Sequence, residues 1–276
     1  MLTAILRSLR TGVVTIRYPD EPAYPPVRFR GAPALRSGSL FGSLPPESVC
    51  PSGAISREPG RYGIDVGRCI FCGRCAESSL DGAMELGRQV ELASRQRKGL
   101  VVEVEPGKDG RSIMLPPPPS GAEVAQQIRR TLGRSLALRH LDSGSCNACD
   151  WELTALLNPV YDVRRLGIDF VASPRHADGV IVTGPVTRNL ETAVRRTYEA
   201  VPEPRVVIAV GACATSGGIV GRSYASAGGV AEVLPVDVFV PGCPPRPEAI
   251  IFGILLAVGR IAVRGNTPPG IGQQHT

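Results

Sequence analysis

The sequence predicts an α/β protein in which a small α+β domain precedes a larger domain built on a doubly wound, mostly parallel sheet. Three observations carry this prediction. Short apolar runs alternate with amphipathic stretches in the second half, a proline-rich segment separates the halves, and the eight cysteines fall into two distant sets. A chain of 276 residues is long enough for two domains that each bury a core.

The predicted strands of the larger domain are short apolar runs, as is typical of buried strands. They cover residues 136–141, 168–172, 179–183, 205–210 and 237–240. Amphipathic stretches predict helices at residues 122–132, 151–157, 190–201 and 247–258. Strands that alternate with helices form a parallel sheet covered on both faces, so we expect a flavodoxin-like fold.

The domain boundary is predicted at residues 116–121, where PPPPSG forms a semi-rigid polyproline spacer. The first domain then covers residues 1–115, including an N-terminal extension, and the second covers residues 122–276. Just before the spacer, residues 100–115 predict two short strands joined at 106–110. We expect this hairpin to close the first domain.

Composition argues against several classes of protein. The net charge of +6 is spread thinly, and no stripe of lysines and stacking aromatics appears, so we expect no nucleic-acid binding. Arginines interrupt the apolar N-terminal segment, unlike a secretory signal. The longest apolar run, 249–258, is shorter than the about 20 residues that span a bilayer. We therefore expect a soluble or peripheral protein of the reducing cytoplasm.

The first cysteine set contains the motif RCIFCGRCAESS, in which Cys69, Cys72 and Cys75 have the C-x2-C-x2-C spacing of a ferredoxin cluster loop. A bacterial ferredoxin continues with x3-C-P, but this chain has Ser79 followed by leucine. Three thiolates are one short of a four-ligand iron–sulfur site.

Cys50, which is followed by proline, supplies the missing ligand in our interpretation. In two-cluster ferredoxins this kind of cysteine binds the cluster of the other motif. Counting back the motif spacing from Cys50 reaches no further thiol, but Pro46, Ser43 and Leu40. We therefore predict that one 4Fe-4S site remains and that the other has lost every ligand, with Ser79 in place of its last cysteine. The ligands of the remaining site are Cys50, Cys69, Cys72 and Cys75. A zinc site on the same thiols is the alternative.

The second cysteine set lies just beyond the carboxyl ends of predicted strands, which meet at one side of a parallel sheet. Its members are Cys146, Cys149, Cys213 and Cys243. Glycines and prolines surround them and allow the tight turns that a buried cluster needs. We predict that they hold a second 4Fe-4S cluster. Simple burial of the cysteines and a flavin on the DSGS loop are the alternatives.

The motifs SGSCNACDWE, SPRHADGVIVTGPVT, PEPRVVIAVGACATSGG and VDVFVPGCPPRPEAIIFGILLAV resemble the cluster-bearing small subunit shared by nickel–iron hydrogenases and respiratory complex I. The resemblance spans about residues 135–261. It implies that Cys146, Cys149, Cys213 and Cys243 hold a cluster next to a separate large subunit. The first domain is similar to the ferredoxin-like subunit that exchanges electrons with it, so the chain resembles the two subunits fused.

The resemblance favours the hydrogenase branch of the formate hydrogenlyase type, because complex I subunits have adjacent cysteines where this chain has Cys146-Asn147-Ala148-Cys149. It implies an electron relay without a catalytic residue of its own, peripheral on the cytoplasmic face of the inner membrane. Expected partners are a nickel–iron or quinone-reducing large subunit, other subunits of a membrane-bound complex, and a further ferredoxin or dehydrogenase as donor. The alternatives are a component of a complex I-like quinone oxidoreductase and a non-redox, metal-stabilised binding protein.

Several residues near the second set have more than one interpretation. Glu152 is either a proton-handling carboxylate close to the cluster or an acid that complements the helix dipole. Asp150 is either a first-turn acid or an N-cap. We expect Trp151 to anchor the core or a subunit contact, and Arg246 to pair with cluster charge or with a partner carboxylate. Structural roles are expected for His140 and His176.

Overall fold

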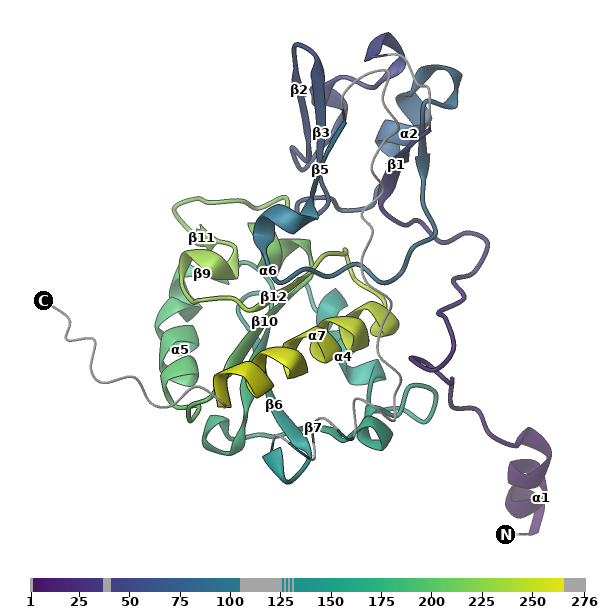
Figure 1. Cartoon of the computed structure of the whole chain (residues 1–276), viewed down its shortest axis with the longest axis vertical. Coiled ribbons are helices and arrows are strands. Elements are labelled where there is room, and N and C mark those ends of the chain that lie inside the picture. The colour runs from purple at the N-terminus through teal and green to yellow at the C-terminus, as the bar shows by residue number, and fades with distance from the viewer. Residues whose placement is uncertain are drawn as a thin grey trace, which may run out of the picture.

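The computed structural model describes residues 2–36, 41–104, 126, 128, 130 and 132–265. A larger α/β body contains the second half of the chain, and a smaller, mainly β body lies on it (Figure 1). Helix α1 (Leu2–Thr11) lies apart from both bodies (Figure 1). None of the helices within these residues is long and apolar enough to cross a membrane.

The larger body is built on a five-stranded parallel sheet with the order β12-β10-β8-β6-β7. Its strands are β6 (Leu136–Asp142), β7 (Ile168–Phe170), β8 (Gly179–Thr183), β10 (Val206–Val210) and β12 (Val238–Val240). Numbered along the chain, the spatial order is 5-4-3-1-2, which is the flavodoxin-like arrangement. The predicted fold class is confirmed, and all five predicted strands are present.

Alternate residues of the central strands face two separate cores, which explains why these strands are apolar throughout. In β10, Val206, Ile208 and Val210 pack in the core beneath α7, whereas Val207 and Ala209 pack in the core beneath α5. Both cores exclude water almost completely. The helices of this body are α4 (Ala148–Ala155), α5 (Arg188–Glu199), α6 (Ala212–Ser216) and α7 (Pro247–Gly265).

The smaller body contains two antiparallel sheets. One has the order β2-β3-β5 and the other pairs β1 with β4. The bounds are β1 (Pro33–Leu35), β2 (Ile55–Glu58), β3 (Arg61–Asp65), β4 (Met84–Leu86), β5 (Val101–Val104) and helix α2 (Arg74–Ser78). Its core gathers Tyr62, Ile64 and Met84 among others.

Two predictions at the domain boundary fall largely outside the described residues. In the expected hairpin of 100–115, β5 forms and pairs with β3, while residues 105–115 are not described. The same holds for the spacer at 116–121 and for most of the helix expected at 122–132, of which four residues are described and helical: Gln126, Ile128, Arg130 and Leu132. The boundary itself stays a prediction.

The remaining elements are short. A small antiparallel pair joins β9 (Val186–Thr187) and β11 (Ser226–Gly228). The 3-10 helices are η1 (Phe41–Ser43), η2 (Glu47–Val49), η3 (Leu80–Gly82), η4 (Arg97–Leu100), η5 (Val163–Leu166), η6 (Pro174–His176) and η7 (Val230–Glu232).

Residues 90–100, here called the connecting segment, join the two bodies. Leu92 packs in the core of the smaller body, whereas Ala93 and Leu100 pack in the two cores of the larger body. Ser94 exchanges two backbone hydrogen bonds with Phe239 of β12, at N···O distances of 2.9 and 2.8 Å. The segment therefore buries apolar side chains on both sides of the junction and fixes the bodies together.

Candidate functional site

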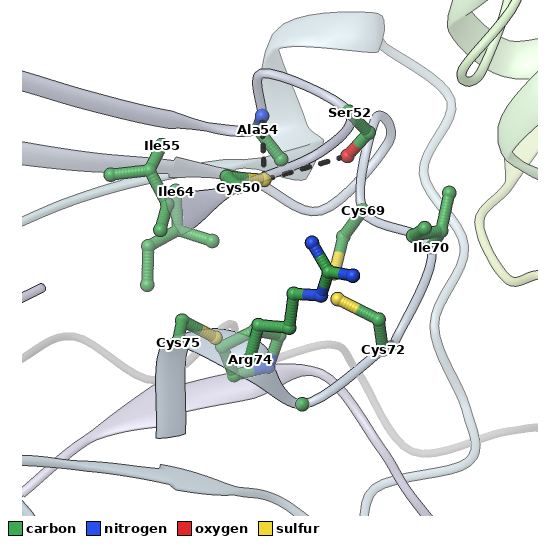
Figure 2. A pocket seen from close by; sticks show the side chains of 12 residues that line it. Cys50, Ser52, Ala54, Ile55, Ile64, Cys69, Ile70, Cys72, Arg74 and Cys75 are labelled. Atoms are coloured by element: carbon green, nitrogen blue, oxygen red, sulfur yellow. Dashed lines mark hydrogen bonds between the residues drawn. The ribbon is translucent and has the colours of Figure 1, made fainter. Parts of the chain in front are cut away.

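The first cysteine set comes together around one pocket in the smaller body. Cys50 follows η2, Cys69 and Cys72 lie in the loop after β3, and Cys75 lies in α2. Figure 2 shows the four sulfur atoms facing a common space, with the side chain of Arg74 across it. The structure therefore places Cys50 beside the loop that carries Cys69 and Cys72, as the sequence predicts.

Hydrogen bonds reach two of the sulfurs in this pocket. The backbone N–H of Ala54 donates to Cys50 Sγ at 3.2 Å, and that of Phe71 donates to Cys69 Sγ at 3.3 Å. The Ser52 hydroxyl lies 3.5 Å from Cys50 Sγ (Figure 2). Donors of this kind stabilise a thiolate and tune the potential of a cluster that it binds.

Burial opposes ionisation of the Cys69 and Cys75 thiols, whereas hydrogen bonding reverses this effect at Cys50. Burial raises the pKa of Cys69 to about 12 and also raises the pKa of Cys75. At Cys50 the hydrogen bonds from Ser52 and Ala54 outweigh burial, so its pKa lies below the usual value. Four thiols in a mostly apolar pocket fit a cationic iron–sulfur core, which would supply the positive charge that the buried thiolates lack.

The position of the lost ferredoxin cysteine has a structural role instead. The Ser79 hydroxyl oxygen lies 3.0 Å from the Ala76 carbonyl and 3.2 Å from the Met84 carbonyl, which share its one proton, and it accepts from the Met84 N–H at 3.3 Å. At the other lost motif, the Tyr62 hydroxyl donates to the carbonyl of Pro45 at 3.1 Å and its ring is fully buried. Pro46 directly follows Pro45, Ser43 lies two residues before Pro45, and Leu40 lies outside the described residues.

The second cysteine set meets at the carboxyl edge of the parallel sheet. Cys146 follows β6, Cys149 lies in α4, Cys213 lies in α6 after β10, and Cys243 follows β12. Burial raises the pKa of Cys149, and the nearby thiols of the other three cysteines raise it further. The four predicted residues are therefore neighbours, with Cys146 and Cys243 exposed and the other two half-buried.

Two glycines make room for these sulfurs. A Cβ atom added to Gly211 would lie 2.5 Å from Cys149 Sγ, and one added to Gly218 would lie 2.7 Å from Cys213 Sγ. Among the residues that the structure describes, no three His, Cys, Asp or Glu side chains are grouped as ligands of a single metal ion would be. A 4Fe-4S cluster is held by one thiolate on each of four irons, so the four-thiol donor set fits this group.

A polar network holds the Cys146 loop against the sheet, and sequence reasoning missed it. Asp150 accepts hydrogen bonds from the hydroxyls of Ser145 and Thr183, the latter at 2.6 Å, and its Oδ1 lies 2.8 Å from His140 Nε2. Asp142 accepts from the backbone N–H of Ser145 at 2.7 Å. The only hint of this network in the sequence is that Ser, Thr and Asp are frequent near the strand ends. That pattern does not reveal which side chains pair across strands.

The structure decides several of the alternatives for single residues. The N-cap of α4 is Asn147, so Asp150 is a first-turn acid. Trp151 is 74% exposed, which rules out a core role. Arg246 pairs with Glu248 of its own chain, at 3.2 and 2.9 Å, and its pairing with cluster charge or with a partner carboxylate stays a prediction.

Glu152 lies beyond the first turn of α4, where the helix dipole has little effect. Partial burial raises its pKa, Arg246 lowers it, and Glu248 raises it. Glu152 therefore lies near the charged pair Arg246 and Glu248 at the start of α7, and the half-buried Tyr161 lies near the same charges. A role close to the cluster stays a prediction.

The two cysteine sites lie near each other across the junction. One pocket has Ile70 and Phe71 of the first cysteine loop on its wall, together with Pro241–Arg246 of the loop that carries Cys243. Arg30 also lines it, and donates to the Cys72 carbonyl at 2.5 Å. Residues directly beside ligands of both predicted clusters thus share one cavity.

Comparison with known proteins gives a family. Residues 146–257, which contain the whole second cysteine set, match the family model described as the 20 kDa subunit of NADH ubiquinone oxidoreductase. The chain is 47% identical to a probable membrane-bound hydrogenase subunit mbhJ of Pyrococcus furiosus over 151 residues, 54% of this chain and 90% of that protein.

Two further relatives represent both branches of the family. Formate hydrogenlyase subunit 7 of Escherichia coli is 41% identical over 138 residues, 50% of this chain and 54% of that protein. A subunit of the NADH-quinone oxidoreductase of Citrifermentans bemidjiense is 45% identical over 119 residues, 43% of this chain and 69% of that protein. Because the match to the Pyrococcus protein covers nearly all of it at high identity, this chain belongs to the family of the 20 kDa subunit of NADH ubiquinone oxidoreductase.

Proposed function

We propose that the chain is the electron-transfer subunit of a membrane-associated, energy-converting hydrogenase-type complex. In this proposal the first and second cysteine sets each hold a 4Fe-4S cluster, and electrons pass between them to or from a separate large subunit. The observation that carries the proposal is the shared pocket between the cysteine loops, with Phe71 on one wall and Cys243 on another.

When bound, each cluster accepts and donates one electron at a time. The chain's own residues determine the positions of the clusters and tune their reduction potentials. Backbone N–H groups of Ala54 and Phe71 point at two sulfurs of the first site, which favours the more negative, reduced form. The second site has no such bond among those found in the described residues, and two of its cysteines are exposed.

The open side of the second site supports a large partner subunit. Cys146 and Cys243 are exposed there, and Trp151 follows Cys149 with 74% of its surface accessible. Ile219 and Tyr224, in the loop after α6, are also exposed. Exposed aromatic and aliphatic side chains of this kind are typical of the core of a protein–protein interface. We propose that the large subunit covers them and holds the chain on the cytoplasmic side of the membrane.

The names of the relatives favour a hydrogenase partner without excluding a quinone-reducing one, since NADH-quinone oxidoreductase proteins match as well. The CNAC motif at Cys146 favours the hydrogenase branch. A complex I-like quinone oxidoreductase is therefore the second candidate.

The test is anaerobic purification of the chain with its partners, followed by metal analysis and low-temperature EPR. About eight irons per chain are expected for two 4Fe-4S clusters that are each bound by four thiolates. Nickel in the co-purified large subunit separates the hydrogenase from the quinone-reducing candidate. Finding only about half of that iron would remove one cluster from the proposal, and about two zinc ions with no reducible cluster would replace it by a metal-stabilised binding protein.

A further inference from the structure

We propose that Arg97 is a positioning residue that holds the Cys69 loop against the helix that carries Cys213, and so sets the separation of the two clusters. The inference rests on the proposed function, since it assumes a cluster at each cysteine set. Arg97 belongs to the connecting segment and touches no cysteine.

On the side of the first site, Arg97 binds Asp65 at the end of β3. Its Nη1 and Nη2 donate to the two carboxylate oxygens of Asp65, at 2.8 and 2.7 Å. The backbone carbonyl of Asp65 accepts from the N–H of Cys69 at 3.1 Å. The guanidinium therefore fixes the residue on which the Cys69 loop turns.

On the side of the second site, Arg97 binds α6. Its Nε donates to the carbonyl of Thr215 at 3.3 Å. Thr215 lies in the same turn of α6 as Cys213 and is almost fully buried. One side chain thus uses three of its nitrogens to join the segments that carry one cysteine of each set.

Gly67 brings these groups into contact. A Cβ atom at this position would lie 2.6 Å from Arg97 Nη1 and 2.9 Å from Thr215 Cγ2. The backbone leading to Cys69 therefore packs directly on the guanidinium and on α6, without an intervening side chain. The close approach leaves little freedom for the distance between the two sites.

The Arg97–Asp65 pair differs from ordinary surface ion pairs of this chain. The side chains of Arg97 and Asp65 are 28% and 22% exposed, and the pair is bidentate. Arg61 and Glu103, on the same sheet, are both 57% exposed and 3.6 Å apart. Partly buried, bidentate pairs hold geometry far better than exposed single contacts, so Arg61 provides a matched control.

The experiment compares wild type with Arg97→Gln, Arg97→Lys and Arg61→Gln in the anaerobically purified complex. Iron content and the EPR signals of both reduced clusters are measured, together with their mutual spin–spin splitting. Hydrogen exchange of residues 66–72 and 212–216 is a readout that needs no magnetic coupling. Because Arg97 binds no cysteine, each variant is expected to keep about eight irons per chain.

We expect Arg97→Gln to lose the splitting and to exchange faster in both segments. Arg97→Lys keeps the charge but cannot bind Asp65 and Thr215 together, so it is expected to recover the splitting only in part. Arg61→Gln is expected to match wild type in every readout.

Two results overturn the positioning role while leaving the proposed function intact. One is an Arg97→Gln complex with the full iron content and unchanged splitting or exchange. The other is loss of a cluster in both Arg97 variants, since Arg97 would then be needed for assembly. Wild type with only half of the expected iron is a different failure, because it removes the two-cluster function and this inference with it.

Discussion

At the scale of single residues, glycines decide whether sulfur atoms can lie where the second site has them. Gly211 has φ +94°, a conformation that L side chains rarely adopt, and a Cβ there would lie 2.5 Å from Cys149 Sγ. Gly218 has φ +57° and approaches Cys213 in the same way. The backbone at these positions is part of the wall around the second cysteine set, so a single methyl group is enough to displace a cysteine sulfur of this set.

Gly211→Ala is expected to abolish the second cluster. The added methyl group would displace Cys149, and the backbone would be strained by about 1–3 kcal/mol. Iron content of the anaerobically purified protein should fall from about eight to about four per chain. Gly221→Ala is the control, because Gly221 also has a positive φ of +62° but a Cβ added there would have no atom within 4 Å. Equal iron in the two variants would mean that Gly211 does not shape the site.

A substitution at Ser79 tests the prediction that this residue replaces a ferredoxin cysteine and binds no iron. Its hydroxyl has hydrogen-bond contacts with the Ala76 carbonyl and with both backbone groups of Met84. Ser79→Ala is expected to lower the free energy of unfolding by about 1–2 kcal/mol, because these bonds are removed. Iron content should not change.

Chemical denaturation and iron analysis check this prediction for Ser79. Ser78→Ala is the control, since the Ser78 hydroxyl makes a single bond, to the Cys75 carbonyl at 3.3 Å. Loss of iron in Ser79→Ala would contradict the assignment, because Ser79 would then be a ligand.

At the scale of elements, strands of the parallel sheet were predictable because both of their faces are buried. In β10, every residue from Val206 to Val210 is buried, so the apolar run in the sequence marks the strand directly. The start of α4 was predicted three residues too late, since the helix begins at Ala148 after Asn147 turns with φ +66°. The left-handed conformation of Asn147 depends on tertiary contacts, so the residue pattern alone does not indicate it.

Helix α4 is tied to the sheet through Asp150, which bonds to residues of β6 and β8. Asp150→Ala is expected to lower the free energy of unfolding by about 1.5–3 kcal/mol, because Thr183 and His140 would lose a charged partner in a buried setting. Chemical denaturation of the anaerobic protein measures this.

The matched control for Asp150 is Asp169→Ala. Asp169 forms an exposed ion pair with Arg164, at 3.2 Å, which is worth about 0–1 kcal/mol. If both variants lose the same stability, the network at α4 contributes nothing beyond a surface pair.

At the scale of the whole molecule, the connecting segment sets how the two bodies meet. It places Leu92 and Leu100 in cores on opposite sides of the junction, and it adds Ser94 to the free edge of β12. Such a junction was not visible in the sequence, because residues 90–100 show no regular apolar period and their partners in the larger body lie far away along the chain. The pairing of β5 with β3 was missed for the same reason.

Ser94→Pro is expected to loosen the junction. Proline has no N–H, so the bond from the Ser94 nitrogen to the Phe239 carbonyl, 2.9 Å long, is lost. Ser94→Ala keeps that bond and removes the hydroxyl contacts with the Gln96 carbonyl, at 2.8 Å, and with the Gln96 N–H, at 3.2 Å. Thermal unfolding should therefore occur at a clearly lower temperature for the proline variant than for the alanine variant, and faster hydrogen exchange should appear at Phe239. Equal unfolding temperatures would show that the backbone pair does not hold the bodies together.

From the sequence alone it could be predicted that the eight cysteines form two sets of four and that a parallel α/β sheet would bring the second set to one edge. These predictions rest on the spacing of the cysteines and on the continuous apolar runs of the buried strands, and both can be recognised within short stretches of sequence. The fold was needed to show that the Cys69 loop and the Cys243 loop line one pocket, that Ser79 and Asp150 serve backbone and loop geometry, and that Arg97 binds both Asp65 and α6. Such contacts pair residues far apart in the chain, and their distances depend on how two packed bodies meet.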